Sequence, residues 1–500
     1  MVDLTGSEKR RGPLNRRPRP PGRERSEEDG GRGKAPDGDG GGRKRPAPRV
    51  PHSKTAELPP WRRLVSFMRE QIAKPPIRVL LFAIGALGVI TPLEMFYSAS
   101  DLVFGSGGDD EPSAVTASAA ITETASEWSD KGFVIGDVEP CRLPNQVDEI
   151  DLGAGFPISA NRLTSKGKVH VAVLFVDFPD AKARHGLGTS DDEYISPEEI
   201  FDEEVPPAGE YLAAMSYREL DMKFWPHHEW LRMSATYSSY SDESSLLVSE
   251  AIALADRQVP FQRIDSVVVF TDPKAELGPS HALVWGNYGS VGADEQIIKN
   301  AIVLVLPSPS EPWGWAGQTI AHELSHNLGL PDLYDNQSAR DPDGYDEAAR
   351  FVGEFGIMGV GSHEKLSSNE MLAWSRWQLG WIHDTQIACV TSFPGSVKIA
   401  PVAVSTGTKA VVVPLTETTA LVVESRRKLG YDLVEGALVY TVDSTVPSGG
   451  GPIVVHNTSS GDVPDASVLL HPGESVTVDG YTVTVEDATL AGDFIKISSP

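Results

Sequence analysis

The chain has few cysteines and only a short hydrophobic run, and both shortages limit what it can be. Cysteine occurs only twice in 500 residues, at Cys141 and Cys389, so at most one intramolecular disulfide can form. The main apolar run, residues 79–93, is 15 residues long. That length is the upper limit for a signal-peptide core and falls short of the roughly 20 residues that a transmembrane helix needs. Length alone therefore does not separate an anchor from a cleaved signal peptide.

Basic residues are also scarce over most of the chain, but not at its start. Residues 1–78 carry 20 Lys and Arg against 10 Asp and Glu, whereas the rest carries 24 against 60. Such asymmetry indicates that the two parts face different surroundings. Residues 1–74 are predicted to be a disordered basic tail, because their Arg, Pro and Gly content cannot bury enough apolar surface to fold. No aromatic residue stands among the basic ones before Trp61, so no nucleic-acid partner is predicted.

The apolar run is predicted to be a membrane anchor. Residues 75–98 are interpreted as an uncleaved transmembrane signal anchor that contacts the membrane through residues 79–97, because the basic leader is far longer than an ordinary n-region. Basic residues precede the run and acidic residues follow it, so the tail stays in the cytoplasm and the rest of the chain lies outside. Secretion after cleavage near Ser100 is the alternative. A physiological start at Met68 in place of Met1 also stays open, since Met68 begins an ordinary short n-region.

One segment has residue types and a spacing that fit a reaction. His322 and His326 stand four apart in residues 318–328, which contain no Gly or Pro and whose apolar residues recur at steps of four. This pattern predicts a helix with one packed face and one face on which both imidazoles can bind the same metal ion. Gly329 is expected to end the helix, and the chain then turns so that Asp332 arrives as a third ligand.

These ligands predict a catalytic zinc site. Two His nitrogens and one carboxylate oxygen leave the fourth tetrahedral position of Zn²⁺ to water. The ion lowers the pKa of that water from about 16 toward about 7, and Glu323 takes its proton as the oxygen attacks a polarised carbonyl. The predicted reaction is peptide-bond hydrolysis without a covalent intermediate. The alternative is a non-catalytic cell-surface adhesion protein with a structural zinc ion, which would not need Glu323.

The motif resembles that of a known family. His322-Glu-x-x-His326-x-x-Gly329-x-x-Asp332 is similar to the metzincin motif of the immune inhibitor A-like (M6) metallopeptidases, and the likeness runs over about residues 141–443. Other segments that resemble the family are residues 169–179, 216–220, 374–381 and 423–440. The resemblance implies an α+β fold with a zincin-like catalytic domain, in which a mixed sheet packs against the active-site helix. It also implies an endopeptidase that acts on extracellular protein substrates.

Two features of the same family bear on the predicted site. Met358 stands in Phe-Gly-Ile-Met-Gly-Val, which resembles the Met-turn, where a methionine lies beneath the metal without binding it; ordinary core packing is the alternative. Some metzincins place a tyrosine two residues after that methionine to assist the oxyanion, but Val360 stands there in this chain. The oxyanion-stabilising residue is therefore unassigned. Tyr334, Tyr345 and His363 are the nearest polar candidates, each with a turn or surface role as the alternative.

Both cysteines lie beyond the apolar run. A disulfide between Cys141 and Cys389 is the simplest prediction in an oxidising compartment, and it would stabilise the fold by roughly 4 to 5 kcal/mol in the chain-entropy model. The alternative is that the Cys141 thiolate occupies the open position of the zinc ion and holds a zymogen latent. A thiol assay on the intact precursor separates the two.

An acidic loop raises the question of a second metal. Residues 335–346 are rich in Asp and could gather oxygen ligands for Ca²⁺. They lack the spacing of a twelve-residue calcium loop, so a solvated loop is the alternative reading.

The part beyond the apolar run divides into three predicted regions. Residues 99–164 are interpreted as a stalk or pro-segment because they are rich in small and acidic residues at their start. Residues 165–388, which alternate strand and helix patterns, are the predicted catalytic domain, and residues 282–285 within it are a candidate edge strand for aligning an extended peptide, with core packing as the alternative. Residues 389–500 show short β-rich runs between turns, which predict a β-sandwich-like domain. No oligomeric state is predicted.

Overall fold

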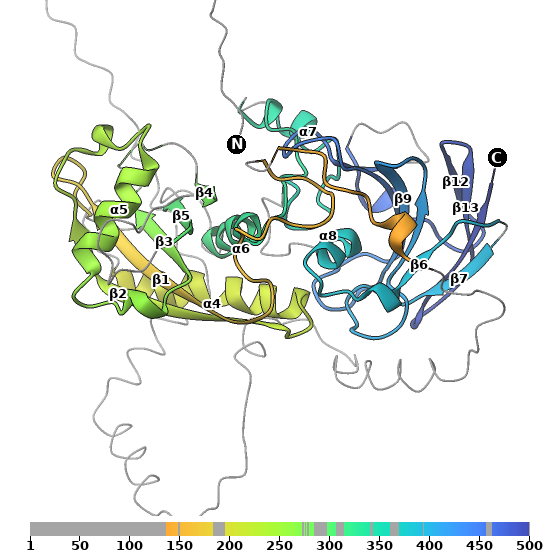
Figure 1. Cartoon of the computed structure of the whole chain (residues 1–500), viewed down its shortest axis with the longest axis horizontal. Helices are drawn as coiled ribbons and strands as arrows, with labels where there is room; N and C mark the ends of the chain where they lie inside the picture. Colours follow the sequence, from red (N-terminus) through yellow and green to blue (C-terminus); the bar gives the residue numbers. More distant parts are fainter. Residues whose placement is uncertain are drawn as a thin grey trace, which may run out of the picture. The chain divides into compact units, whose positions relative to one another are not determined.

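Three β-sheets and a few helices form the part of the chain that the structure describes (Figure 1). This mixed α/β structure is compatible with the predicted α+β class. The computed structural model describes residues 137–148, 151–183, 196–272, 275, 277, 280–284, 298–306, 315–340, 344–360, 370–393, 395–456 and 463–499. All of them belong to Gly108–Pro500, one of two units into which the chain divides. The predicted basic tail, residues 1–74, lies outside the described residues.

The prediction of a transmembrane helix needs correction. Among the described residues, every helix is too short or too polar to cross a membrane. Helix α4 (Pro197–Met215) has 19 residues but carries six acidic side chains. For this part of the chain the transmembrane prediction is therefore wrong, and the predicted anchor itself, residues 75–98 with 79–97 as its membrane contact, lies outside the described residues.

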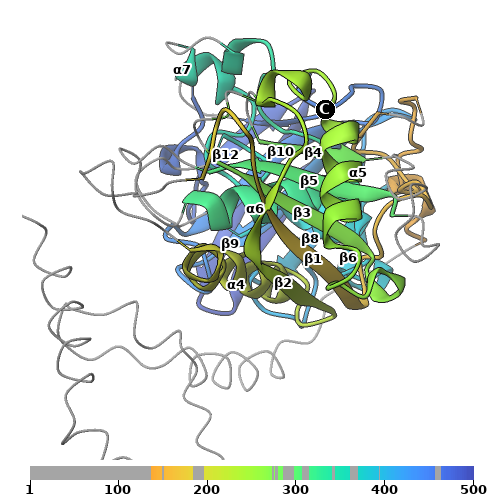
Figure 2. The same ribbon diagram turned by 90° about the vertical axis from the view of Figure 1, so that its left-hand side faces the viewer.

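The first sheet has five strands in the order β2-β1-β3-β5-β4 (Figure 2). Strands β1 (Gly167–Asp177), β2 (Leu220–Arg232), β3 (Ser266–Thr271) and β5 (Asn300–Val305) pair parallel with one another. The edge strand β4 (His281–Val284) runs antiparallel to β5. Strands β3 and β5 are almost wholly buried, as expected for inner parallel strands with continuous apolar sequences.

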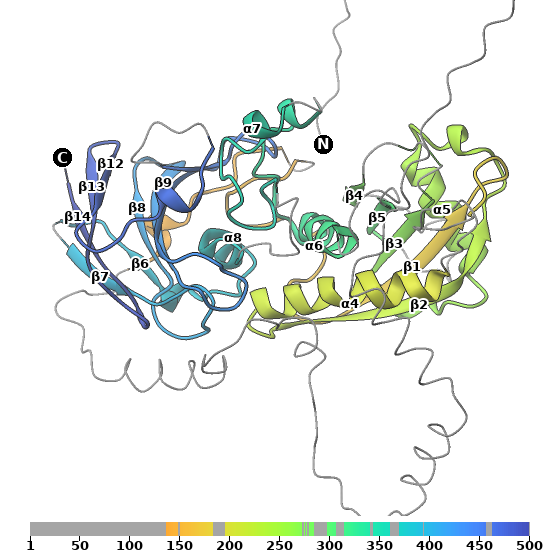
Figure 3. The ribbon, with the colours of Figure 1, turned by 180° about the vertical axis from the view of Figure 1, so that it is seen from behind.

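Helices cover both faces of this sheet. Alternate residues of β1 point to opposite faces, so one set joins the core formed with α4 and α6 (Trp315–Leu328), and the other joins the core formed with α5 (Ser244–Ala255). Figure 3 shows α4 running along the sheet with α6 beside it. Short further helices are α7 (Tyr345–Ala348) and α8 (Ala373–Gln378).

The start of α4 is a capping box. The Ser196 hydroxyl accepts the N–H of Glu199 at 3.2 Å, and the Glu199 carboxylate accepts the N–H of Ser196 at 3.1 Å, while Pro197 occupies the first helical position. These bonds satisfy two N–H groups that a helix end otherwise leaves without partners. The sequence Ser-Pro-Glu-Glu at residues 196–199 is typical of such a capped helix start.

The C-terminal region consists of two sheets that share one core (Figure 1). The first has the order β11-β10-β9-β8-β6, from strands Ile453–Val455, Gly436–Asp443, Thr419–Arg426, Ala410–Pro414 and Ile387–Cys389. The second has the order β12-β13-β14-β7, from strands Ser475–Val478, Tyr481–Thr489, Gly492–Ser498 and Gly395–Ile399. The predicted short β-rich runs are therefore strands.

A continuous core joins the first sheet and its helices to the C-terminal sheet of β6 and β8–β11. The buried helix α8 contributes Trp374 and Trp377, and both pack edge-on against Phe156, with ring centroids 5.5 and 4.7 Å apart. The same core includes Val422 and Tyr440 of the C-terminal region. The segment that contains Phe156 ends the predicted stalk or pro-segment, so this end of it belongs to the packed structure.

Buried charges lie in this shared core. Arg426, in β9, pairs with Glu424 at 2.5 Å and with Asp432 at 2.9 Å, and none of the three side chains is exposed. Arg376, in α8, pairs with Glu370, and these side chains are also buried. Because both Arg426 Nη1 and the Asp432 carboxylate bond to the Glu370 backbone, at 2.7 and 3.0 Å, the two pairs form one connected network.

Candidate metal centre

The helix predicted to carry the metal ligands is present as α6. Its apolar stripe packs into the core through Ile320, Leu324 and Leu328, which are all buried. His322 and His326 lie off this stripe. The predicted helix, with one packed face and with both histidines off that face, is confirmed; that the histidines bind a metal stays a prediction.

A buried carboxylate from another helix holds the N-terminal end of α6. The N–H of Gly317 donates to Glu204 Oε2 at 3.0 Å, and the Glu204 residue is only 1% exposed. A negative charge at this end satisfies N–H groups in the first turn and interacts favourably with the helix dipole. Glu204 lies in α4, 113 residues upstream, so this bond helps to fix the ligand helix relative to α4.

The end of α6 is set by glycine, as predicted. Gly329 has φ +114°, and a side chain there would meet the Ile158 side chain at 2.4 Å. The N–H groups of Gly329 and Leu330 both donate to the carbonyl of Ser325 at 3.0 Å, which closes the last turn. The chain then reverses and carries Asp332 back toward the histidines.

The three predicted ligands converge. Asp332 Oδ1 lies 3.1 Å from His322 Nε2 and 3.1 Å from His326 Nε2. Each residue offers one ligand atom, and these three atoms all lie within 4.8 Å of one another. Within the described residues, His322, His326 and Asp332 form a group of metal-ligand side chains that could hold an ion. All three side chains are largely buried.

The hydrogen bonds of the histidines fix which nitrogen faces the site. His322 Nδ1 lies 2.8 Å from the carbonyl oxygen of Ile357, and His326 Nδ1 lies 2.8 Å from that of Leu330. A carbonyl only accepts, so each Nδ1 carries a proton, and each Nε2 is the nitrogen that faces Asp332. Carbonyl oxygens bonded to the distal nitrogen are the usual support of metal-binding histidines.

Two of the distances between ligand atoms suit a tetrahedral ion. Bonds of about 2.0 to 2.1 Å from zinc to nitrogen and oxygen place tetrahedral ligand atoms roughly 3.3 Å apart. The two distances of 3.1 Å to Asp332 Oδ1 are close to that value. The residues therefore fit a zinc ion held by His322, His326 and Asp332.

The electrostatics of the site also favour a cation. Burial lowers the pKa of His326, but Asp332 and Glu323 act more strongly in the opposite direction and raise it to about 9. Burial would raise the pKa of Asp332, yet the two histidines hold it well below its usual range. Both shifts show that positive charge between these side chains is stabilised.

Glu323 lies beside the ligand set without joining it. The residue is buried, and its charge raises the pKa of both His326 and Tyr334, so its carboxylate is within electrostatic range of the site. It does not belong to the group whose ligand atoms converge. A buried carboxylate next to the ligands, but separate from them, is suited to accept a proton there.

The segment with the predicted Met-turn lies against the site. The carbonyl of Ile357 accepts from His322, and the carbonyl of Met358 accepts the N–H of Leu333 at 2.8 Å. The Met358 side chain is buried in the core. Its predicted role beneath a metal stays a prediction.

Among the three polar candidates for stabilising an oxyanion, the structure places Tyr334 at the site. Its ring centroid lies 6.0 Å from that of His322. Burial, and then the charges of Asp332 and Glu323, raise its pKa above the usual range, so the hydroxyl keeps its proton at neutral pH. His363 lies outside the described residues, as does the side chain of Tyr345.

Two residues at the site had no signal in the sequence. The second oxygen of Asp332, Oδ2, accepts hydrogen bonds from Ser448 Oγ at 3.0 Å and from Asn336 Nδ2 at 3.2 Å. The N–H of Asp332 donates to Ser448 Oγ at 2.8 Å. Ser448 is 116 residues downstream, so only the tertiary fold reveals the pairing.

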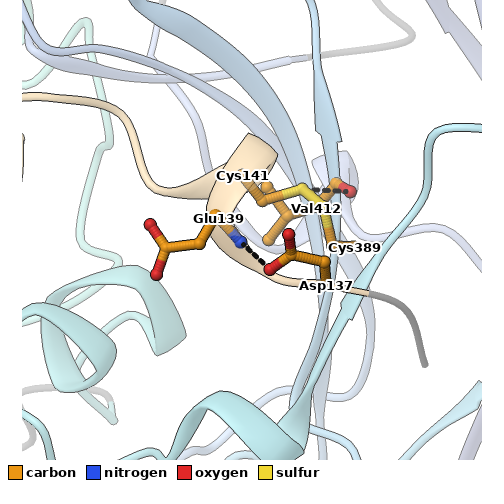
Figure 4. The surroundings of a disulfide bond; sticks show 5 residues. All are labelled: Asp137, Glu139, Cys141, Cys389 and Val412. Atoms are coloured by element: carbon orange, nitrogen blue, oxygen red, sulfur yellow. Dashed lines mark hydrogen bonds between the residues drawn. A yellow bond between two sulfur atoms is a disulfide. The ribbon is translucent and has the colours of Figure 1, made fainter.

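The two cysteines form the predicted disulfide (Figure 4). Cys141 and Cys389 have Cα atoms 5.8 Å apart, both residues are buried, and Cys141 Sγ lies 3.3 Å from the carbonyl oxygen of Val412. Cys141 therefore has no free thiolate, and the alternative of a cysteine bound to the open zinc position is wrong for this structure.

Removing the disulfide is expected to lower the stability of the fold without raising the hydrolytic activity. In the full chain, Cys141→Ala with Cys389→Ala should lower Tm by about 5 to 10 °C, because the bond closes a long loop. Differential scanning calorimetry measures this. Wild-type protein treated with a reductant is the control. A higher hydrolytic activity of the untreated variant would instead favour a Cys141 thiolate that blocks the open zinc position.

The contacts of Asp335 do not support the predicted Ca²⁺ site in residues 335–346. Its carboxylate pairs with Arg350 at 2.7 Å and accepts the N–H of Gln337 at 3.0 Å and the hydroxyl of Ser338 at 3.0 Å. These partners occupy the oxygens that an ion would need. Residues 341–343 of the acidic loop lie outside the described residues.

No protein-family model matches the chain, and no curated protein matches it. What the site can do is therefore argued from its own geometry.

Proposed function

We propose that the chain is a zinc-dependent endopeptidase of the metzincin type, as its resemblance to the immune inhibitor A-like metallopeptidases implies. The convergence of His322, His326 and Asp332, with each Nδ1 directed to a carbonyl, carries the proposal. These three residues would hold one Zn²⁺ and leave a position open, which is the arrangement of catalytic rather than closed structural sites.

The chemistry divides between the ion and the chain. When bound, the ion supplies a Lewis acid for a substrate carbonyl and a lowered pKa for water. Glu323 accepts the proton of the attacking water and returns it to the amine that leaves. The two transfers balance, since the proton taken from water ends on the leaving nitrogen.

The sheet supports the finer fold proposal of a metzincin-like catalytic domain followed by a β-sandwich-like domain. Four strands are parallel, and the antiparallel edge strand β4 lies next to α6, which carries His322 and His326. The predicted edge strand, residues 282–285, overlaps β4, whose first three residues are half-buried. An extended peptide that adds to this edge by main-chain hydrogen bonds would pass the metal site. The two C-terminal sheets with their shared core support the sandwich.

The disulfide supports a site of action outside the cytoplasm. Disulfides such as Cys141–Cys389 form and persist in oxidising compartments. Extracellular proteins or peptides are accordingly the proposed substrates.

Chelation tests the proposal directly. The full chain, incubated with unfolded casein, should produce fragments; 1,10-phenanthroline should stop the cleavage, and added Zn²⁺ should restore it. Zinc in excess of its dissociation constant by 1,000-fold should also stabilise the fold by about 4 kcal/mol, seen as a higher Tm. Cleavage that persists at full rate in chelator, or purified protein without stoichiometric zinc-binding capacity, would contradict the proposal.

A further inference from the structure

The orientation of the third ligand is set by a loop far away in the sequence. Asp332 follows a helix end, and nothing in its own backbone dictates that its carboxylate turns one oxygen toward the histidines. Its Oδ1 faces both His Nε2 atoms, and its Oδ2 faces Ser448 and Asn336. Ser448 belongs to residues 444–452, which connect β10 to β11 in the C-terminal region.

The hydrogen bonds of Ser448 are directional. Its Oγ accepts the N–H of Asp332 at 2.8 Å, so the hydroxyl proton is free to point to Asp332 Oδ2 at 3.0 Å. One hydroxyl thus holds both the backbone and the side chain of the ligand. A rotation of the carboxylate away from the histidines would break the second bond.

The loop is itself fixed on both sides of Ser448. The N–H of Ser448 donates to the carbonyl of Leu152 at 2.8 Å, and the N–H of Gly449 donates to the carbonyl of Asp332 at 3.1 Å. Gly449 has φ +71°, and a side chain there would meet Asn336 Nδ2 at 2.0 Å. Only glycine lets the loop approach the turn this closely.

We propose that Ser448 is a positioning residue for the metal, so that the C-terminal β region completes the metal centre. Its hydroxyl holds Asp332 Oδ2 and thereby presents Oδ1 to an ion bound by His322 and His326. This inference rests on the proposed function, because it assumes that the three ligands bind zinc. Partners that orient a metal ligand in this way commonly change metal affinity by 10- to 100-fold when they are removed.

The test compares zinc affinity in matched variants of the full chain. Ser448→Ala should raise the Zn²⁺ dissociation constant, measured by competition with a chromophoric chelator, about 10- to 100-fold. Ser448→Thr keeps the hydroxyl and should stay within about 3-fold of the wild type. Thr445→Ala removes an exposed hydroxyl from the same loop. This hydroxyl donates to the Asp443 carboxylate, so its loss should leave the zinc affinity unchanged.

A structural role alone would give a different result. In that case Ser448→Ala would lower the Tm of the metal-free protein but leave the zinc affinity unchanged, which would overturn the inference. A loss of zinc affinity in Ser448→Thr as large as that in Ser448→Ala would overturn the inference as well. If Ser448→Ala does not fold, Ser448→Cys keeps nearly the same size but offers only a weak hydrogen-bond partner, and unchanged zinc affinity in that variant would overturn the inference.

The outcome also separates this inference from the proposed function. Wild-type protein that binds no zinc would remove the basis of both. Wild-type protein that binds zinc as tightly as Ser448→Ala would overturn only the role of Ser448.

Discussion

Glu323→Gln is expected to lower kcat for peptide hydrolysis by about 10²- to 10⁴-fold while zinc stays bound. The amide keeps the size and the hydrogen-bonding shape of the side chain but cannot accept a proton. Because Glu323 lies outside the converging ligand atoms, the ligand set is intact in the variant. Steady-state kinetics on a fluorogenic peptide, together with zinc content by mass spectrometry, measure the two effects separately.

A surface carboxylate provides the control for Glu323. Glu347 is exposed in α7, so Glu347→Gln changes the net charge equally and should leave kcat within about 2-fold of the wild type. Unchanged hydrolysis in Glu323→Gln would refute its role as the base. Loss of zinc from that variant would contradict the assignment of Glu323 as a residue that does not bind the ion.

The parts of the site that local sequence patterns describe could be predicted. The periodicity of residues 318–328 predicted a helix with its ligands off the packed face, and Gly329 marked its end. The spacing from that glycine to Asp332 was enough to predict that Asp332 lies beside the histidines, because a short turn restricts where the next side chain can go. The capped start of α4 was predictable for the same reason, since caps depend on neighbours in sequence.

The parts that depend on distant pairs left no local trace. Glu204 and Ser448 are an ordinary acidic residue in a helix and an ordinary serine in a Gly-rich loop, and their contacts with the site span 113 and 116 residues. Nothing in spacing or periodicity marks either one. The continuous core between α8 and the C-terminal strands was missed for a similar reason: its apolar side chains could have packed within either region alone.

Arg426→Met is expected to lower the free energy of unfolding by about 3 to 5 kcal/mol at neutral pH. The substitution leaves the buried carboxylates of Glu424 and Asp432 without their cation and removes a 2.7 Å hydrogen bond to the Glu370 carbonyl. Uncompensated charge in a core costs more than a lost surface pair, because water cannot solvate it. The effect corresponds to a fall in Tm of about 5 to 15 °C.

Arg218→Met is the matched control for Arg426→Met. Arg218 pairs with Glu210 at 2.9 Å, but both side chains are about two-thirds exposed, so the same substitution should change stability by less than about 1 kcal/mol. A loss of this small size in Arg426→Met would show that the core network contributes little.

The loss caused by Arg426→Met should also depend on pH. Burial, only partly opposed by Arg426, raises the pKa of Asp432 to about 6 in the folded protein, above its ordinary value of about 4. An acid with a raised folded pKa gives its full stabilising contribution below about pH 4 and loses it as the pH rises through 6. Without Arg426 the folded pKa rises further, so the variant should be closer to the wild type at pH 5 than at pH 7.5. A loss that is equal at both pH values would mean that Asp432 takes up no proton when its cation is removed.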